Sequence, residues 1–374
     1  MKFIFAPDSF KGSLSSINVA ARMAEGVQRV YPEAECLLLP MADGGEGTMD
    51  ALVLSRGGMT AETKVTGPNG KEVNAKWGLL MDGTAVIEMA QASGLPLMRG
   101  KKDPMSATSY GTGELIRAAA HDAMRIVIGI GGSATNDGGM GMLSALGVQF
   151  FDENGEILRG CGADLIRVRR VDFSRIDSNV LNCPIDVLCD VDNPLLGETG
   201  ATYVYGPQKG ADEEMLKALE AGMENYARVM QEALGRDIAH FPGAGAAGGL
   251  GAALCGVLSA NRLPGAETVL DLIEFDKKVQ GAAVCFTGEG RMDGQSIKYG
   301  KAPVQVAERC QKANVPCIAI VGGLGEGGQA FCKKGQSVLS IANGPMTLDE
   351  CLLHAGDLVA DAAERAMRMV QMKI

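Results

Sequence analysis

The N-terminal part of the chain alternates short apolar runs with segments of helical spacing. Residues 2–7 and 35–40 are apolar runs that predict buried strands. Between them, residues 16–30 follow Ser15 and place apolar side chains three and four positions apart, which predicts an amphipathic helix with a capping residue. Residues 48–56 predict a second, short helix. This order of strand and helix is typical of parallel βα units.

The C-terminal part repeats this order. Three apolar runs predict strands, at 282–288, 316–323 and 337–344. Residues 302–313 predict a helix, and a long final helix is predicted from about Leu348 to Met372. Strands that are apolar throughout are typical of a parallel sheet with both faces covered.

The middle of the chain has a different pattern. Residues 62–89 alternate as in antiparallel hairpins, with a turn signal at Pro68-Asn69-Gly70. Residues 125–133 and 186–193 predict further strands that end in loops rich in glycine and acids. The terminal stretches supply roughly five βα units, enough for one doubly wound sheet.

We therefore predict a two-domain α/β protein. Residues 1–60 and 282–374 would form a discontinuous flavodoxin/Rossmann-like parallel-sheet domain, and residues 61–281 would form an inserted α/β domain. Two sequential domains are the alternative arrangement.

Charge and hydropathy narrow the classes of partner. The 374 residues include 45 acids and 35 bases, so the net charge is -10. An acidic chain of this kind argues against nucleic acid and against an anionic membrane surface as partners. No apolar run reaches the length of about 18 residues that a membrane span needs. The start of the chain does not fit a signal peptide, so we expect a cytoplasmic protein.

Cysteine and glycine usage refine this picture. The 10 cysteines form no CxxC pair and no zinc-like spacing with any of the 3 histidines, so we expect reduced, structural thiols. Glycine accounts for 51 of the 374 residues, twice the ordinary share of about 7%. Because the glycines cluster where apolar runs end, they mark places where the backbone turns tightly or approaches a ligand.

Loops that follow the predicted strands carry the candidate chemistry, since ligands of open α/β sheets bind beyond the carboxyl ends of the strands. The first loop has Asp8, Ser9 and Lys11 just before a helix, an arrangement that suits an anion. The alternative is that its serines serve only as helix caps.

The second loop has Asp43, Gly44, Gly45 and Glu46. Its two carboxylates make Mg²⁺ a candidate ligand, and the alternative is that the loop is an ordinary solvated turn. The next loop, residues 129–139, contains Gly131, Gly132, Ser133, Asn136 and Asp137 and predicts a backbone nest for phosphate.

Two later loops add carboxylates. Alternation would put Asp190 and Asp192, which precede Asn193, on one face if the preceding strand continues that far. Such a pair can hold Mg²⁺, or one member can take a proton from a hydroxyl group. The other loop has Glu289, Arg291 and Asp293, with Lys298 and Lys301 following. In both loops the alternative is an ordinary polar turn.

Dinucleotide motifs are poorly matched. The GxGxxG run at 243–248 does not follow a strand, and the one at 323–328 has Asn343 where an acid is expected. There is also no Walker A motif. Anion nests together with carboxylates for Mg²⁺ fit phosphoryl transfer best, because that reaction depends on positioning and charge neutralisation.

Seven motifs together resemble one family. They are APDSFKGSLS (6–15), MADGGEGT (41–48), GIGGSATNDGG (129–139), CDVDNPLLGETGA (189–201), GPQKGA (206–211), GAGAAGGLGAAL (243–254) and TGEGRMDGQS (287–296). In this set the chain resembles the bacterial glycerate kinase family, class I (glycerate 2-kinase). The resemblance implies phosphorylation of D-glycerate by ATP with Mg²⁺, giving 2-phospho-D-glycerate, on two α/β domains around a cleft.

On this reading the catalytic residues would be Asp190, Asp192 and Lys11. We favour Asp190 as the base because it lies nearer the strand. Lys11, Arg291 and the nests would bind phosphate oxygens and the glycerate carboxylate. The candidate Mg²⁺ ligands are Asp192, Asp43, Glu289 and Asp293. We expect a monomer or a homodimer, and the alternatives are a non-catalytic nucleotide- or hydroxy-acid-binding regulator and an NAD(P)-linked hydroxy-acid oxidoreductase.

Overall fold

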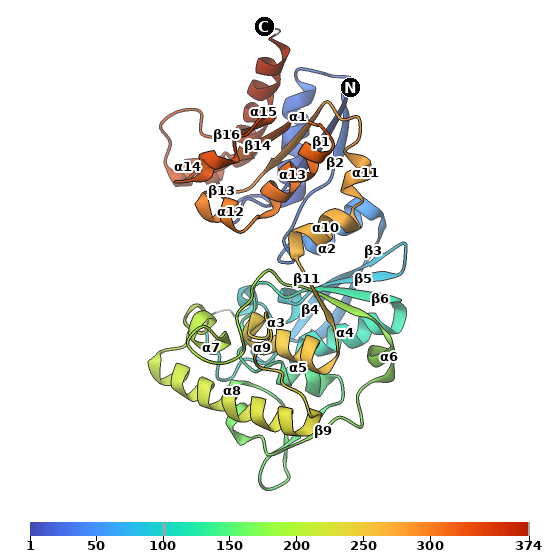
Figure 1. The fold of residues 1–374 in the computed structure, drawn as a ribbon, viewed down its shortest axis with the longest axis vertical. Helices are drawn as coiled ribbons and strands as arrows, with labels where there is room; N and C mark the ends of the chain where they lie inside the picture. The colour runs from blue at the N-terminus through green and yellow to red at the C-terminus, as the bar shows by residue number, and fades with distance from the viewer. Residues whose placement is uncertain (99, 101, 373–374) are drawn as a thin grey trace. The chain divides into compact units, whose positions relative to one another are not determined.

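The computed structural model describes residues 1–98, 100 and 102–372. It is a mixed α/β protein with parallel strands in its two largest sheets (Figure 1), which confirms the predicted α/β class. The chain forms two compact units. Unit 1 contains residues 1–43 and 50–57 and the residues from Ala266 onward, and unit 2 contains residues 44–49 and 58–265.

Unit 1 is built on a five-stranded sheet in which all strands are parallel. In spatial order the strands are β16 (Gln336–Ser340), β14 (Cys317–Val321), β12 (Val284–Gly288), β1 (Lys2–Pro7) and β2 (Glu35–Leu38). Numbered along the chain within this sheet, the order is 2-1-3-4-5, so the direction of strand addition reverses between β1 and β12. A doubly wound sheet binds ligands at such a switch point. Two short strands, β13 (Arg291–Met292) and β15 (Gly323–Leu324), pair separately.

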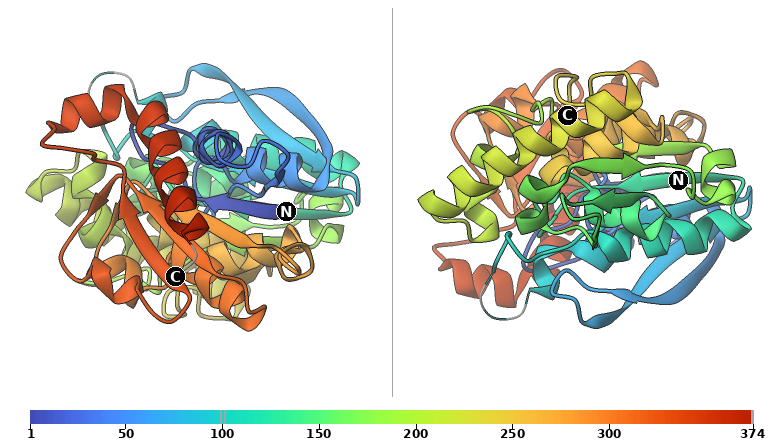
Figure 2. Two further views of the ribbon diagram at one scale, coloured as in Figure 1. Left: turned by 90° about the horizontal axis from the view of Figure 1, so that it is seen from above. Right: turned by 90° about the horizontal axis from the view of Figure 1, so that it is seen from below.

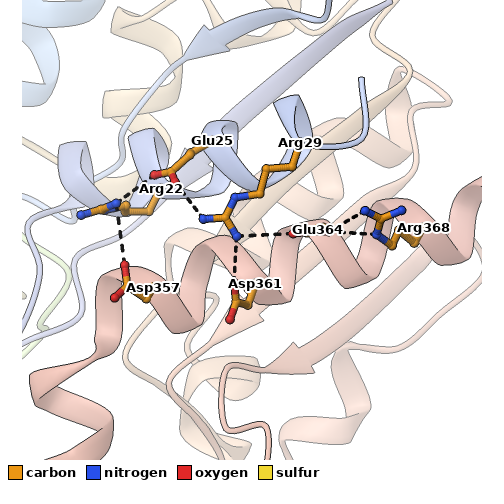
Figure 3. A network of polar contacts seen from close by, with 7 residues as sticks. All are labelled: Arg22, Glu25, Arg29, Asp357, Asp361, Glu364 and Arg368. Carbon is orange, nitrogen blue, oxygen red and sulfur yellow. Dashed lines mark hydrogen bonds and ion pairs between the residues drawn. The ribbon is translucent and has the colours of Figure 1, made fainter. Parts of the chain in front are cut away.

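The helices of this half of the fold flank the sheet. They are α1 (Ser16–Gln28), α2 (Thr48–Arg56), α10 (Gly265–Leu272), α11 (Phe275–Lys278), α12 (Gly294–Lys298), α13 (Ala302–Lys312), the 3-10 turn η5 (Gly328–Phe331), α14 (Leu348–Leu353) and α15 (Ala355–Gln371). Helices α1 and α15 pack closely along their length, as Figure 2 shows from above. Gly26 permits this approach, because a Cβ atom there would lie 2.0 Å from the carbonyl oxygen of Ala360. Ion pairs between Arg29 and Asp361 and Glu364 line the outer edge of the contact (Figure 3).

The prediction of one continuous final helix is wrong. Thr347 and Glu350 form a capping box that starts α14, and the helix ends at His354 before α15 begins. The two segments have different surroundings. No residue of α14 is buried, whereas α15 buries an apolar face that includes Val359 and Ala363. The apolar spacing continues through His354, so the pattern alone did not reveal the break.

Unit 2 contains a six-stranded sheet. In spatial order its strands are β11 (Asn261–Leu263), β10 (Ile185–Leu188), β6 (Arg125–Gly129), β5 (Thr84–Glu88), β4 (Glu72–Leu80) and β3 (Gly58–Thr66). Strand β4 pairs antiparallel with both β3 and β5, and the pairs from β5 through β6 and β10 to β11 are parallel. The predicted hairpin turn is confirmed, because the Gly67 N–H donates to the Lys71 carbonyl oxygen at 2.7 Å.

A smaller antiparallel sheet and several helices complete this unit. The sheet contains β8 (Ile157–Leu158), β7 (Gln149–Phe151) and β9 (Arg170–Asp172). The helices are α3 (Ala90–Ser93), η1 (Leu95–Leu97), α4 (Tyr110–Asp122), α5 (Met140–Ala145), η2 (Gly162–Arg167), α6 (Ser178–Asn182), α7 (Ala201–Tyr205), η3 (Pro207–Lys209), α8 (Glu213–Leu234), α9 (Ala246–Gly251) and the π-helical η4 (Ala252–Val257). The longest, α8, packs on η2 and is seen from below in Figure 2.

Unit boundaries differ from the domain boundaries that the sequence suggested. Residues 266–281 belong to unit 1, although the prediction placed them in the inserted segment. Within unit 1, Arg309 of α13 pairs with Asp271 at 2.7 Å and with Asp276 at 2.6 Å, so this segment contacts the helix that follows β12. Residues 44–49 and 58–60 group with unit 2. The division into two domains stays a prediction.

Each unit has its own apolar core. The core of unit 1 includes Phe3, Phe5, Met23 and Phe286, and that of unit 2 includes Phe150 and other residues from its two sheets. All ten cysteines are free thiols, as expected. In the described part of the chain, no helix has the length and apolarity that crossing a membrane requires.

Candidate functional site

A cavity of about 630 Å³ lies at the carboxyl ends of β1 and β12 in unit 1. This is the switch point of the five-stranded sheet, and the volume falls within the usual range of small-molecule sites, about 300–1,000 Å³. The cavity brings together seven of the residues that the sequence singled out, namely Asp8, Ser9, Lys11, Asp43, Glu289, Arg291 and Asp293. Residues of the first and last of the five predicted loops, together with Asp43 of the second, therefore meet at one place.

Asp8 directly follows β1 and is held by the backbone of its own loop. The Ser9 N–H donates to Oδ1 of Asp8 at 2.6 Å. Burial, together with the negative charge of Asp43, raises the pKa of Asp8 to about 7, although the Ser9 N–H and the Lys11 ammonium act to lower it. A carboxyl group with this pKa changes its charge near neutral pH, so a bound cation would favour its ionised form.

Glu289 directly follows β12 and is 6% exposed. Its Oε1 atom is buried and has no hydrogen-bond partner among the described residues. Its Oε2 atom lies 3.9 Å from Nζ of Lys301. Burial raises the pKa of Glu289. A buried carboxylate oxygen without a partner is costly, so this atom is suited to a cation or to a hydrogen-bond donor from a ligand.

Asp293 combines a structural role with a place in the cavity. Its Oδ1 atom accepts from the backbone N–H groups of Gln295 and Ser296 and thereby caps α12. Its Oδ2 atom lies 3.8 Å from Nε of Arg291, whose side chain is 75% exposed.

Lys301 also lines this cavity, although it was not among the predicted site residues. It stands at the N-terminus of α13, and its place in the run of charges after β12 was the available signal.

The proposed metal ligands do not form a ready-made cluster. Among the described residues, the one group of three or more metal-ligating side chains within 4.8 Å of one another is Cys285, Cys310 and Cys317, not a set of carboxylates. Asp43, Glu289 and Asp293 nevertheless line the same cavity. Asp192 belongs to unit 2, where it pairs with Arg262 at 2.5 Å.

In unit 2, three of the predicted loops lie against one another. Gly44, at a φ of 89°, packs on Leu188 at the end of β10, and a Cβ atom on Gly44 would lie 2.6 Å from Cβ of Leu188. Gly129, at the end of β6, packs on the Gly44 carbonyl, and Gly131 lies beside Gly45. A Cβ atom on Gly129 would lie 2.1 Å from the Gly44 carbonyl oxygen, so a side chain at Gly44 or Gly129 would clash with its neighbour. Glu46, from the same loop, has an exposed side chain.

The loop of residues 129–139 separates into an exposed part and a buried part. Gly131 and Gly132 are exposed, and Ser133 Oγ donates to the Ala247 carbonyl oxygen at 3.2 Å. Asn136 and Asp137 are fully buried. A contact of a ligand with this loop would therefore be made through the backbone of its exposed part, and the assignment of Asn136 and Asp137 to a binding site stays a prediction.

Both buried side chains instead hold the loop in place. Asp137 accepts from the N–H and the hydroxyl of Ser109, each at 2.7 Å, and burial raises its pKa. Asn136 donates from Nδ2 to Thr202 Oγ1 at 3.2 Å.

The condition for aligning Asp190 with Asp192, namely that the preceding strand continues as far as these residues, is not met. Strand β10 ends at Leu188, so the backbone of both residues is outside the strand. Asp190 accepts from the Gly265 N–H at 2.7 Å. Asn193 donates to the Thr199 carbonyl and accepts from the Tyr205 hydroxyl, so it shapes its own loop.

Comparison with known proteins identifies the family. A family model described as "Glycerate kinase family" matches residues 3–371. The chain belongs to the glycerate kinase family. This confirms the resemblance that the seven motifs indicated, and with it the prediction of an enzyme.

Similar sequences and a similar solved structure support membership of the same family. The chain is 47% identical to a glycerate kinase of Bacillus cereus over 94% of this chain and 93% of that protein. It is 44% identical to the glycerate 2-kinase of Escherichia coli K12 over 97% of this chain and 96% of the relative. A solved structure described as glycerate kinase 2 of Salmonella typhimurium LT2 matches with a TM-score of 0.87 and 41% identity, covering 99% of this chain and 98% of that one.

Proposed function

We propose that this member of the glycerate kinase family transfers the γ-phosphoryl group of ATP to D-glycerate in the presence of Mg²⁺. The product would be 2-phospho-D-glycerate. The observation that carries the proposal is the cavity of unit 1, which is lined by Asp8, Asp43 and Glu289 together with Lys11 and Lys301. The position of phosphorylation that we propose is the one in the name of the Escherichia coli relative, glycerate 2-kinase.

The cations of unit 1 suit the charges of this reaction. Both ATP and glycerate are anions, whereas the chain carries a net charge of -10, so local positive charge must offset the overall field. Lys11 and Arg291 line the cavity and are exposed to an incoming ligand. We assign them to phosphate oxygens or to the substrate carboxylate, where each would stabilise negative charge.

The carboxylates of unit 1 suit a divalent cation. Asp43, Glu289 and Asp293 would hold Mg²⁺, and the unpartnered Oε1 atom of Glu289 fits that assignment. Bound Mg²⁺ would neutralise charge on the phosphate groups. Asp192 fits this role less well, because Arg262 already neutralises its carboxylate.

The residues of unit 2 would bind and deprotonate the acceptor. Gly131, Gly132 and Ser133 would offer backbone N–H groups to an anion, as the exposed part of their loop allows. Asp190 would take the proton of the glycerate hydroxyl as the phosphoryl group arrives. The hydrogen bond from the Gly265 N–H fixes this carboxylate in one position, as a general base requires.

An initial-rate assay of ADP release tests the proposal. ADP should form only when ATP, Mg²⁺ and D-glycerate are all present, and EDTA should stop its formation. Glu289→Gln should lower turnover by about 10²-fold, the scale of one lost electrostatic contact at a reaction centre. Glu326→Gln is the matched control, because Glu326 is exposed and does not line the cavity. ADP release at the same rate without glycerate would contradict the proposal.

A further inference from the structure

The cavity of unit 1 has an apolar wall that the chemistry of phosphoryl transfer does not use. Its apolar lining comes from Phe10, Leu324, Ile341, Leu348, Leu352 and Ala355. Phosphate groups and a three-carbon hydroxy acid present almost no apolar surface, so neither would gain from this wall. A nucleotide carries a ring system that does.

Helix α14 supplies the most exposed part of this wall. Leu348 is 73% exposed and Leu352 is 39% exposed, and no residue of α14 is buried. Leucine side chains in such positions contribute little to the stability of the fold, because they bury little apolar area. Their presence beside a cavity is therefore better explained by a ligand that covers them.

The same helix is tied to the loop that carries Lys11. Ser13 Oγ donates to the Leu352 carbonyl oxygen at 3.3 Å. The capping box of Thr347 and Glu350 fixes the start of α14, with the Glu350 carboxylate accepting from the Thr347 N–H at 2.8 Å. The apolar wall is thus anchored to the loop that carries Lys11, and both line one cavity.

We propose that this cavity is the nucleotide subsite, with the purine ring against Ile341, Leu348 and Leu352 and the phosphate groups toward Lys11 and Lys301. The inference rests on the proposed function, since it assigns one of the two substrates of that reaction to unit 1. The volume of about 630 Å³ accommodates a nucleotide. A glycerate molecule alone would leave most of this space and the whole leucine surface uncovered.

Serine variants of the full chain test the subsite. Leu348→Ser and Leu352→Ser each remove apolar surface from the cavity. Leu353→Ser is the matched control, because Leu353 lies on the same helix and is 78% exposed but does not line the cavity. Binding of the fluorescent nucleotide mant-ADP is measured without glycerate, and the KM values for ATP and for glycerate are measured separately.

The first two variants should weaken mant-ADP binding by about tenfold each, the effect of losing one well-packed apolar contact. In the same two variants the KM for ATP should rise, while the KM for glycerate and the Tm should stay at the wild-type values. Leu353→Ser should bind mant-ADP as the wild type does. Unchanged mant-ADP binding in Leu348→Ser and Leu352→Ser, or equal weakening in all three variants, would overturn the proposal.

Assays of the wild type together with the leucine variants distinguish a failure of this inference from a failure of the proposed function. In one outcome the wild type binds mant-ADP tightly and the leucine variants bind it more weakly, but no ADP forms from ATP and D-glycerate. This result would contradict the proposed kinase reaction and support the nucleotide subsite. In another outcome the wild type turns over normally, and the leucine variants have a raised KM for glycerate but not for ATP. This result would support the reaction and contradict the nucleotide subsite.

Discussion

The ammonium group of Lys209 donates a hydrogen bond to the carbonyl oxygen of Thr135 at 2.5 Å, and both residues are buried. This bond joins the segment after α7 to the Gly-rich loop of residues 129–139. Gly248, at a φ of 72°, also packs there, and a Cβ atom on it would lie 2.0 Å from the Thr135 carbonyl oxygen. The loop that we assign to anion binding is therefore held from its buried side by a lysine and a left-handed glycine.

Burial of Lys209 predicts a pH-dependent stability. Burial lowers its pKa to about 7, whereas the unfolded chain has the ordinary value of 10.5. Between these values the unfolded chain binds more protons, so the free energy of unfolding rises with pH in this window. From pH 7 to pH 9 the contribution is roughly 2 kcal/mol, and Lys209→Met should remove it.

Urea unfolding of the wild type and Lys209→Met at both pH values measures this difference. Lys217→Met is the control, because Lys217 is an exposed residue of α8. Its pH dependence should equal that of the wild type. The same change of stability with pH in the wild type and Lys209→Met would show that Lys209 has an ordinary pKa.

Substitution of Asp190 tests its role as the base. Asp190→Asn keeps the shape of the side chain and an oxygen for the Gly265 N–H, but it removes the charge that would accept a proton. Turnover should fall by about 10²–10⁴-fold, the usual scale for a general base, with little change in Tm. Glu153→Gln, in the exposed turn between β7 and β8, is the matched control. Near-normal turnover of Asp190→Asn would exclude the assignment.

Gly26 in α1 and Arg29, the residue that directly follows this helix, should respond very differently to substitution. Gly26→Ala would put a Cβ atom 2.0 Å from the Ala360 carbonyl oxygen and 2.8 Å from Ala363 Cβ, so α1 and α15 would have to separate. The expected cost in unfolding free energy is about 2 kcal/mol or more. Arg29→Met removes the exposed ion pairs of Arg29 with Glu25, Asp361 and Glu364 (Figure 3), and each such pair contributes about 1 kcal/mol or less. Thermal unfolding of both variants gives the comparison, and an equal loss of Tm would refute this view of the helix contact.

Much of the fold could be predicted from the sequence. Apolar runs such as residues 2–7 identify the parallel strands because both faces of these strands are buried. The turn at Pro68-Asn69-Gly70 identified the hairpin through its backbone preferences. These signals are local, and each element is decided by a few neighbouring residues.

The features that local patterns missed depend on tertiary surroundings. Lys209 and Asn136 are buried by residues that pack over them in the folded chain, so the residues next to them in the sequence give no sign of their burial. Strand β10 ends at Leu188 because the chain then turns, so the alternation expected for Asp190 and Asp192 does not apply. Lys301 joins the cavity because α13 begins beside β12, a relationship that only the folded sheet creates.

Phosphorus-31 NMR of the purified protein with ATP, Mg²⁺ and D-glycerate tests the central claim most directly. We expect a new resonance of 2-phosphoglycerate that grows as the γ-phosphate signal of ATP declines, and no such resonance when glycerate is omitted. A 3-phosphoglycerate resonance would contradict the position of transfer that we propose. An unchanged ATP spectrum from folded protein would contradict the phosphorylation of D-glycerate itself.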